Sequence, residues 1–168
     1  IYMILRLKLR KKNQSQLVNV ALITLELKIR ILNDFFFDEQ VALATRFDLP
    51  LIIHSVNATD DVTDLLKSYS KSRGVIHAFS GSLQQAENLL KINFSFGFGS
   101  ALTNPLAYKL HDIVKFLPIE SIVIEIDDRK NTDELIQVAE RIARIKKLSV
   151  DQVIDQCDQN TFNIFNIS

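Results

Sequence analysis

Short apolar segments alternate with amphipathic helical segments along most of this chain. Four such segments occupy residues 49–54, 75–79, 94–98 and 121–126, and a stretch with apolar residues at helical spacing follows each of them. Residues 23–31 alternate apolar and polar side chains with period two and add a further predicted strand. Strands separated by helices pair in parallel, because the helix returns the chain to the same end of the sheet. The sequence therefore predicts an α/β fold on a parallel sheet.

Two sequence motifs predict where helices begin. Ser82 is followed three residues later by Gln85, and Ser149 is followed in the same way by Gln152. A serine and a glutamine at this spacing form a capping box, in which each side chain accepts a hydrogen bond from the other residue's backbone. We therefore expect one helix to start after Ser82 and another after Ser149.

Composition limits the class of protein. A chain of 168 residues that is 47% hydrophobic buries one ordinary core, so a single domain over residues 1–168 is expected. The single cysteine, Cys157, excludes an internal disulfide and suits a reducing compartment, so we expect a cytoplasmic protein in which this thiol is a packing residue. No apolar run approaches the roughly 20 residues of a membrane-spanning helix, so no membrane association is expected.

Charge is balanced overall but uneven along the chain. Lys and Arg together number 20, as do Asp and Glu, so net charge does not indicate a nucleic-acid partner. Residues 1–32, however, contain seven basic side chains and one acidic one. This excess fits either contact with an anionic partner or a solvated strand face and loop.

Three polar side chains stand at the ends of predicted strands: His54, His77 and Asp127. The carboxyl ends of parallel strands share one rim of a sheet or barrel, where ligands and catalytic groups gather. Imidazole and carboxylate are ligands for divalent ions such as Zn, Mn or Mg. A lone histidine beside a strand is more often a hydrogen-bonded core residue, but three such placements favour a site. The remaining histidine, His111, is predicted on the solvent side of a helix.

The chain contains, in order, the segments DEQ, DLPLIIHS, GVIHAFSGSLQQAE, FGFGS, VIEIDD and QNTFNIFN. This series resembles the TatD family of metal-dependent hydrolases, usually described as deoxyribonucleases, and HAFSGS is its most specific segment. The similarity spans residues 33–168 and leaves residues 1–32 divergent. It implies a TIM-type barrel whose C-terminal mouth holds two divalent ions that activate water to cleave DNA or another phosphodiester.

The resemblance also implies roles for individual residues. His54 and His77 match family metal ligands, and Asp127 matches the carboxylate on the final barrel strand, which also orients or deprotonates the attacking water. The family's glutamate ligand aligns with Thr24, so Glu26, on the same strand face two residues on, becomes the candidate fourth ligand. The cofactor implied is a divalent Zn, Mg or Mn ion.

Two departures from the family pattern weaken the expected activity. The family begins with a strand bearing an HxH pair, whereas this chain has only three histidines and no such pair. The arginine that usually follows IHS is Val56 here, which removes an expected phosphate contact. We therefore weigh an active hydrolase against a catalytically impaired remnant that keeps the scaffold only. With these losses we expect at most one weakly held ion and little nuclease activity.

Length predicts an incomplete barrel. A full barrel of this type takes roughly 250 residues, and the strands recognised here correspond to the last five of eight. Residues 1–9 alternate well enough to supply a replacement strand, so about five or six of eight strands are expected, without the usual N-terminal ones. The gap would leave open sheet edges that invite self-association.

Overall fold

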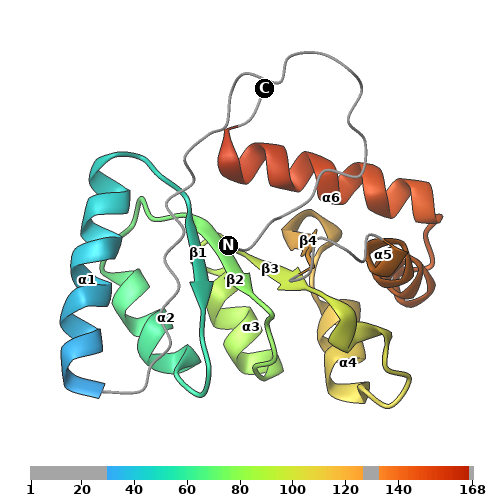
Figure 1. Cartoon of the computed structure of the whole chain (residues 1–168), viewed down its shortest axis with the longest axis horizontal. Helices are drawn as coiled ribbons and strands as arrows, with labels where there is room; N and C mark the ends of the chain where they lie inside the picture. Colours follow the sequence, from blue (N-terminus) through green and yellow to red (C-terminus); the bar gives the residue numbers. More distant parts are fainter. Residues whose placement is uncertain (1–29, 127–132, 167–168) are drawn as a thin grey trace.

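Strands and helices alternate throughout the part of the chain that the computed structural model describes, residues 30–126 and 133–166. The colours in Figure 1 run in order across the sheet, from blue α1 beside β1 to red α6 near β4. The elements are, in chain order, α1 (Arg30–Arg46), β1 (Leu51–His54), α2 (Thr59–Lys67), β2 (Gly74–His77), α3 (Leu83–Leu90), β3 (Phe94–Phe98), the 3₁₀ helix η1 (Ser100–Thr103), α4 (Tyr108–Phe116), the 3₁₀ helix η2 (Ile119–Ser121), β4 (Ile122–Ile124), α5 (Asp133–Lys146) and α6 (Val150–Phe165).

The four strands form one parallel sheet in the order β1-β2-β3-β4, which confirms the predicted α/β class. Each strand neighbours the next along the chain, as in strand–helix repeats of the barrel type. The further strands predicted at residues 1–9 and 23–29 lie outside the described residues. Arg30 and Ile31, predicted to end a strand, instead begin α1, because a short alternating run does not distinguish the two structures.

The two faces of the sheet have different side chains. Successive residues of a strand point to opposite faces, so the register separates them cleanly. One face joins the helices in the main hydrophobic core, through Leu51, Ile53, Ile76, Phe94, Phe96, Phe98, Ile122 and Ile124. The other face is smaller and more polar, with Ile52, His54, Val75, His77, Ser95, Gly97, Val123 and, just past β4, Glu125. The candidate histidines are therefore on the face away from the aromatic core.

Helix boundaries agree with the capping motifs and differ at one turn. Both predicted capping boxes are present, at Ser82 and at Ser149. Leu106, predicted within a helix, is instead 69% exposed, and α4 begins two residues later. The reason is Asn104, whose side-chain oxygen accepts the Leu106 N–H at 2.9 Å and so forms a turn in place of the first helical turn. None of the described helices is long and apolar enough to cross a bilayer.

His111 and Cys157 are placed by local packing. The ring of His111 is half-buried rather than solvated, and its Nε2 lies 3.1 Å from the carbonyl oxygen of Leu102, which ties α4 to η1. The predicted solvent-side position of His111 is therefore only partly correct. Cys157 is a packing residue as predicted, with 4% of its surface exposed. Burial, with a smaller contribution from the charge of Asp158, raises the pKa of the Cys157 thiol to about 12.

Asn160 connects α6 to the start of β4. Its side-chain Nδ2 donates to the carbonyl oxygens of Ile119 at 2.8 Å and Ile122 at 2.7 Å. Its Oδ1 accepts from Gln156 Nε2 at 2.9 Å, and only 3% of the residue is exposed. A buried amide with all these partners fixes the last helix against the strand that precedes the candidate site.

We expect Asn160→Ala to lower the free energy of unfolding by about 1–3 kcal/mol, because it leaves buried carbonyl groups without a donor. Asn163→Ala is the matched control on the same helix: its side chain is exposed and accepts only from Gln159. The control should change stability by less than about 0.5 kcal/mol. Urea denaturation of the three proteins measures the difference, and equal stabilities would show that Asn160 does not anchor α6.

Candidate functional site

Two histidines meet at the carboxyl ends of neighbouring strands. His54 ends β1, His77 ends β2, and the two are paired in the parallel register. Their ring centroids are 5.4 Å apart, with the ring planes tilted by 42°. His77 is 4% exposed and His54 is half-buried. The fold therefore brings together two imidazoles that are 23 residues apart in the sequence.

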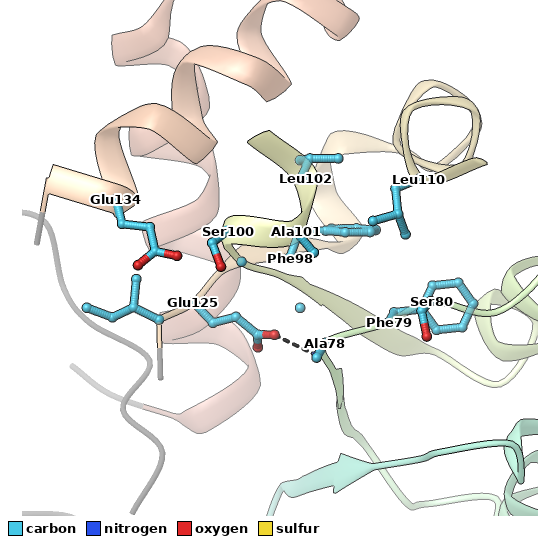
Figure 2. A pocket seen from close by; sticks show the side chains of 13 residues that line it. Ala78, Phe79, Ser80, Phe98, Ser100, Ala101, Leu102, Leu110, Glu125 and Glu134 are labelled. Atoms are coloured by element: carbon cyan, nitrogen blue, oxygen red, sulfur yellow. Dashed lines mark hydrogen bonds between the residues drawn. The ribbon is translucent and has the colours of Figure 1, made fainter. Parts of the chain in front are cut away.

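Glu125 approaches His77 across β3, on the same face of the sheet. Its Oε2 lies 2.9 Å from His77 Nδ1, and its Oε1 accepts the Ala78 N–H at 2.6 Å, the contact drawn as a dashed line in Figure 2. The contact with Nδ1 has the distance of an ion pair but not the alignment of a linear hydrogen bond. Glu125 is 3% exposed, so both interactions are in a region shielded from water.

Gly97 makes room for this carboxylate. A Cβ atom at Gly97 would lie 2.0 Å from Glu125 Oε2, which no side chain could tolerate without displacing the carboxylate. At Gly99 a Cβ would come only to 3.2 Å from the backbone oxygen of Glu125. The two glycines, which do not form a phosphate-binding GxGxxG loop, therefore have different structural roles.

The turn after His77 is conformationally strained. Ala78 has a φ of 49°, in the left-handed region that disfavours residues with a Cβ by roughly 1–2 kcal/mol. The hydrogen bond from the Ala78 N–H to Glu125 holds this conformation. The strain thus occurs directly beside a candidate ligand, as is common at functional sites.

The predicted site residues are only partly within the described structure. His54 and His77 lie together, whereas Asp127 and Glu26 fall outside the described residues. Within residues 30–126 and 133–166, no group of three or more His, Cys, Asp or Glu side chains is arranged to hold a metal ion. Two adjacent imidazoles, one with a carboxylate against its Nδ1, nevertheless have the chemistry of a partial divalent-metal site.

Glu125 is the residue that sequence reasoning missed. The sequence favours Asp127, the carboxylate that follows the last strand, because that position faces the rim in parallel folds. The sequence contains a signal for Glu125: it is an acidic residue inside an otherwise apolar segment, residues 122–126. An acidic side chain buried within a strand requires a partner, and here His77 and the Ala78 N–H provide it.

A cavity of about 240 Å³ opens beside Glu125 at the same end of the strands. Figure 2 shows Glu134 and Ser100 on one side of it and Phe79 and Ser80 on the other. Phe98, which is only 2% exposed, backs the cavity from the core, and Glu125 also borders it. The cavity therefore joins apolar surface to hydroxyl and carboxylate groups close to the histidines.

Comparison with known proteins identifies close similarity over most of the chain. A family model described as "TatD related DNase" matches residues 32–166. The metal-dependent hydrolase YjjV of Escherichia coli is 32% identical over 145 residues, which are 79% of this chain and 56% of that protein. YabD of Bacillus subtilis, also called a metal-dependent hydrolase, is 32% identical over 145 residues, covering 79% of this chain and 57% of YabD.

One human relative, besides a 3'-5' RNA nuclease called TATDN2, is named for an activity on DNA. It is called deoxyribonuclease TATDN3 and is 28% identical over 135 residues, which are 75% of this chain and 48% of that protein. The crystal structure of E. coli YjjV superposes with a TM-score of 0.76 at 29% identity, covering 87% of this chain and 62% of YjjV. The chain thus spans about half the length of the curated relatives it matches.

The three histidines of the chain allow a controlled test of metal binding. We expect His54→Ala and His77→Ala each to weaken Zn²⁺ binding by about 100-fold or more, because losing a direct ligand should exceed the roughly 10- to 100-fold cost of losing an outer partner. His111→Ala should leave the affinity unchanged, since His111 contacts η1 instead. Calorimetric titration of chelator-treated protein measures this. Unchanged affinity in both His54 and His77 variants would exclude the pair as ligands.

Proposed function

This chain belongs to the TatD related DNase family, and from that premise we propose that it hydrolyses phosphodiester bonds, with DNA as its substrate, by metal-dependent activation of water. The observation that most supports this proposal is the pairing of His54 and His77 at the strand ends. Relatives that are called metal-dependent hydrolases support the need for a divalent ion.

In this proposal His54 and His77 hold the ion, and Asp127 and Glu26 complete its ligands. A bound Zn, Mn or Mg ion would lower the pKa of a water molecule and polarise a phosphoryl oxygen. Asp127 would orient the attacking water or accept its proton.

The cavity beside Glu125 supports a nucleotide substrate. Its volume of about 240 Å³ is below the roughly 300–1,000 Å³ of pockets that enclose drug-sized ligands, so it suits part of one nucleotide unit rather than a duplex. Phe79 and Phe98 border the cavity from the core and are only 3% and 2% exposed, so they shape its wall without offering an open face for base stacking. Ser80 and Ser100 add hydroxyl groups for polar contacts. We infer that a single-stranded end is the preferred part of the substrate.

A second proposal, a catalytically impaired remnant, also has specific support. Val56 occupies the position at which the resemblance to the family implies an arginine, and its apolar side chain is 59% exposed. The described residues bring only two candidate ligands together. A protein of this kind would keep the strand–helix scaffold and lose most of its metal affinity.

The cysteine and the sheet edges support proposals about cellular location and self-association. We propose a cytoplasmic protein with one domain, in which the single buried cysteine needs no oxidising compartment. Within the described residues β1 and β4 each pair on one side only. Because unpaired strand edges favour association, we also propose that copies of this chain associate with one another.

Cleavage of a short single-stranded DNA with Mg²⁺, Mn²⁺ or Zn²⁺ distinguishes the two proposals. An active hydrolase should give slow cleavage that chelation abolishes, that His77→Ala lowers by about 100-fold or more, and that His111→Ala preserves. Equal trace cleavage by the unmodified chain and His77→Ala would support the remnant. Cleavage that persists in chelator would contradict a metal-dependent reaction. Comparing the cleavage rates of the same sequence as single-stranded DNA, duplex DNA and RNA tests the preference for single-stranded DNA.

A further inference from the structure

We propose that Glu125 is a positioning residue that fixes the proton of His77 on Nδ1 and thereby leaves Nε2 as the metal-binding nitrogen. The proposal deepens the metal site described above and rests on it for the role of His77. It concerns an interaction that lies wholly within the described residues.

The contact between Glu125 and His77 defines which imidazole nitrogen carries the proton. A neutral imidazole has one N–H donor and one lone pair. Oε2 of Glu125 lies 2.9 Å from Nδ1, and both residues are almost fully buried. The contact is not aligned as a linear hydrogen bond, but the negative charge lies close to Nδ1. A lone pair on Nδ1 would therefore be repelled in surroundings that screen charge weakly, whereas an N–H there is attracted. The Nδ1–H tautomer is therefore favoured.

The carboxylate reaches His77 only because β3 has a glycine at the crossing point. The sheet order places β3 between β2, which bears His77, and the strand that precedes Glu125. Strands two apart are separated by roughly 9–10 Å, a gap that a side chain at the intervening position would fill. Gly97 leaves this space open. A Cβ atom at this position would lie 2.0 Å from Glu125 Oε2 and so overlap the carboxylate.

Backbone hydrogen bonds hold both ends of the interaction. The Glu125 N–H donates to Phe98 O at 3.1 Å, and the Phe79 N–H donates to Gly97 O at 3.1 Å. Oε1 accepts the Ala78 N–H at 2.6 Å, so the carboxylate is bound to the residue that directly follows His77. With one oxygen fixed in this way, the other has little freedom to leave Nδ1.

This arrangement has a chemical consequence for a metal ligand. A carboxylate against one imidazole nitrogen fixes the tautomer and raises the basicity of the other nitrogen toward a metal. A purely structural ion pair between the two strands would need neither effect. The two roles therefore differ in the tautomer of His77 and in metal affinity, and not only in stability.

Two variants perturb the contact by different routes. Glu125→Gln keeps the size of the side chain and removes its charge, whereas Gly97→Ala keeps the charge and displaces the carboxylate. Gly99→Ala is the matched control, because its Cβ would approach the backbone oxygen of Glu125 at 3.2 Å and reach no carboxylate oxygen. Circular dichroism and thermal unfolding establish that each variant is folded.

The first readout is the tautomer of His77 in metal-free protein labelled with ¹⁵N-histidine, from long-range ¹H–¹⁵N spectra at pH 8.5, with His77→Ala used to assign the signals. We expect Nδ1–H in the unmodified chain and in Gly99→Ala. Glu125→Gln and Gly97→Ala should both shift His77 toward Nε2–H. An Nε2–H or doubly protonated His77 in the unmodified chain would overturn the proposal, as would an unchanged tautomer in the folded variants.

The second readout is Zn²⁺ affinity by calorimetry. Glu125→Gln and Gly97→Ala should each weaken binding by about 10- to 100-fold, with Gly99→Ala unchanged. Unaltered affinity in folded Glu125→Gln would overturn the positioning role. If the unmodified chain binds no Zn²⁺ while His77 is Nδ1–H, the metal-dependent function fails, and the tautomer assignment stands separately.

Discussion

One buried carboxylate connects the last strand of the sheet to the candidate ligand two strands away. Glu125 contacts His77 Nδ1 and the Ala78 N–H, and both contacts are shielded from water. A buried charge of this kind is costly unless partners compensate it. Three local features accommodate this carboxylate. They are the absence of a side chain at Gly97, the left-handed backbone of Ala78, and the register of β2, β3 and β4.

The opposite face of the sheet provides the stability that such an arrangement needs. Phe94, Phe96 and Phe98 alternate along β3 and are almost completely buried in the core shared with the helices. Asn160 fixes α6 to the backbone on either side of Ser121, close to the start of β4. Because apolar burial on one face stabilises the sheet, the other face can hold imidazole and carboxylate groups close together. The candidate site thus depends on the hydrophobic packing on the opposite face of the sheet.

The sequence was sufficient for the repeating elements and for part of the site. Apolar runs predicted the four described strands, two capping boxes predicted helix starts, and strand-end positions predicted that His54 and His77 share a rim. These features depend on residues close together in the chain or on the general geometry of parallel sheets. They are therefore visible without the tertiary structure.

Glu125 and Gly97 could not be interpreted in the same way. Their contact depends on strand order and register, which place a residue after β4 against one at the end of β2. The period-two pattern gives the face of a residue but not its neighbour two strands away. Leu106 shows a more local limit, since an Asn104 side chain competing for its backbone N–H ended the predicted helix early.

We propose that Glu125 presents His77 to a metal ion through Nε2, with His54 beside it. Anomalous diffraction at the zinc edge, from crystals of the chain grown with Zn²⁺, tests this most directly. We expect a zinc peak about 2.0–2.1 Å from His77 Nε2 and from a ring nitrogen of His54, with Nδ1 of His77 still against Glu125. Zinc bound through His77 Nδ1, or found only at sites away from both histidines, would contradict it.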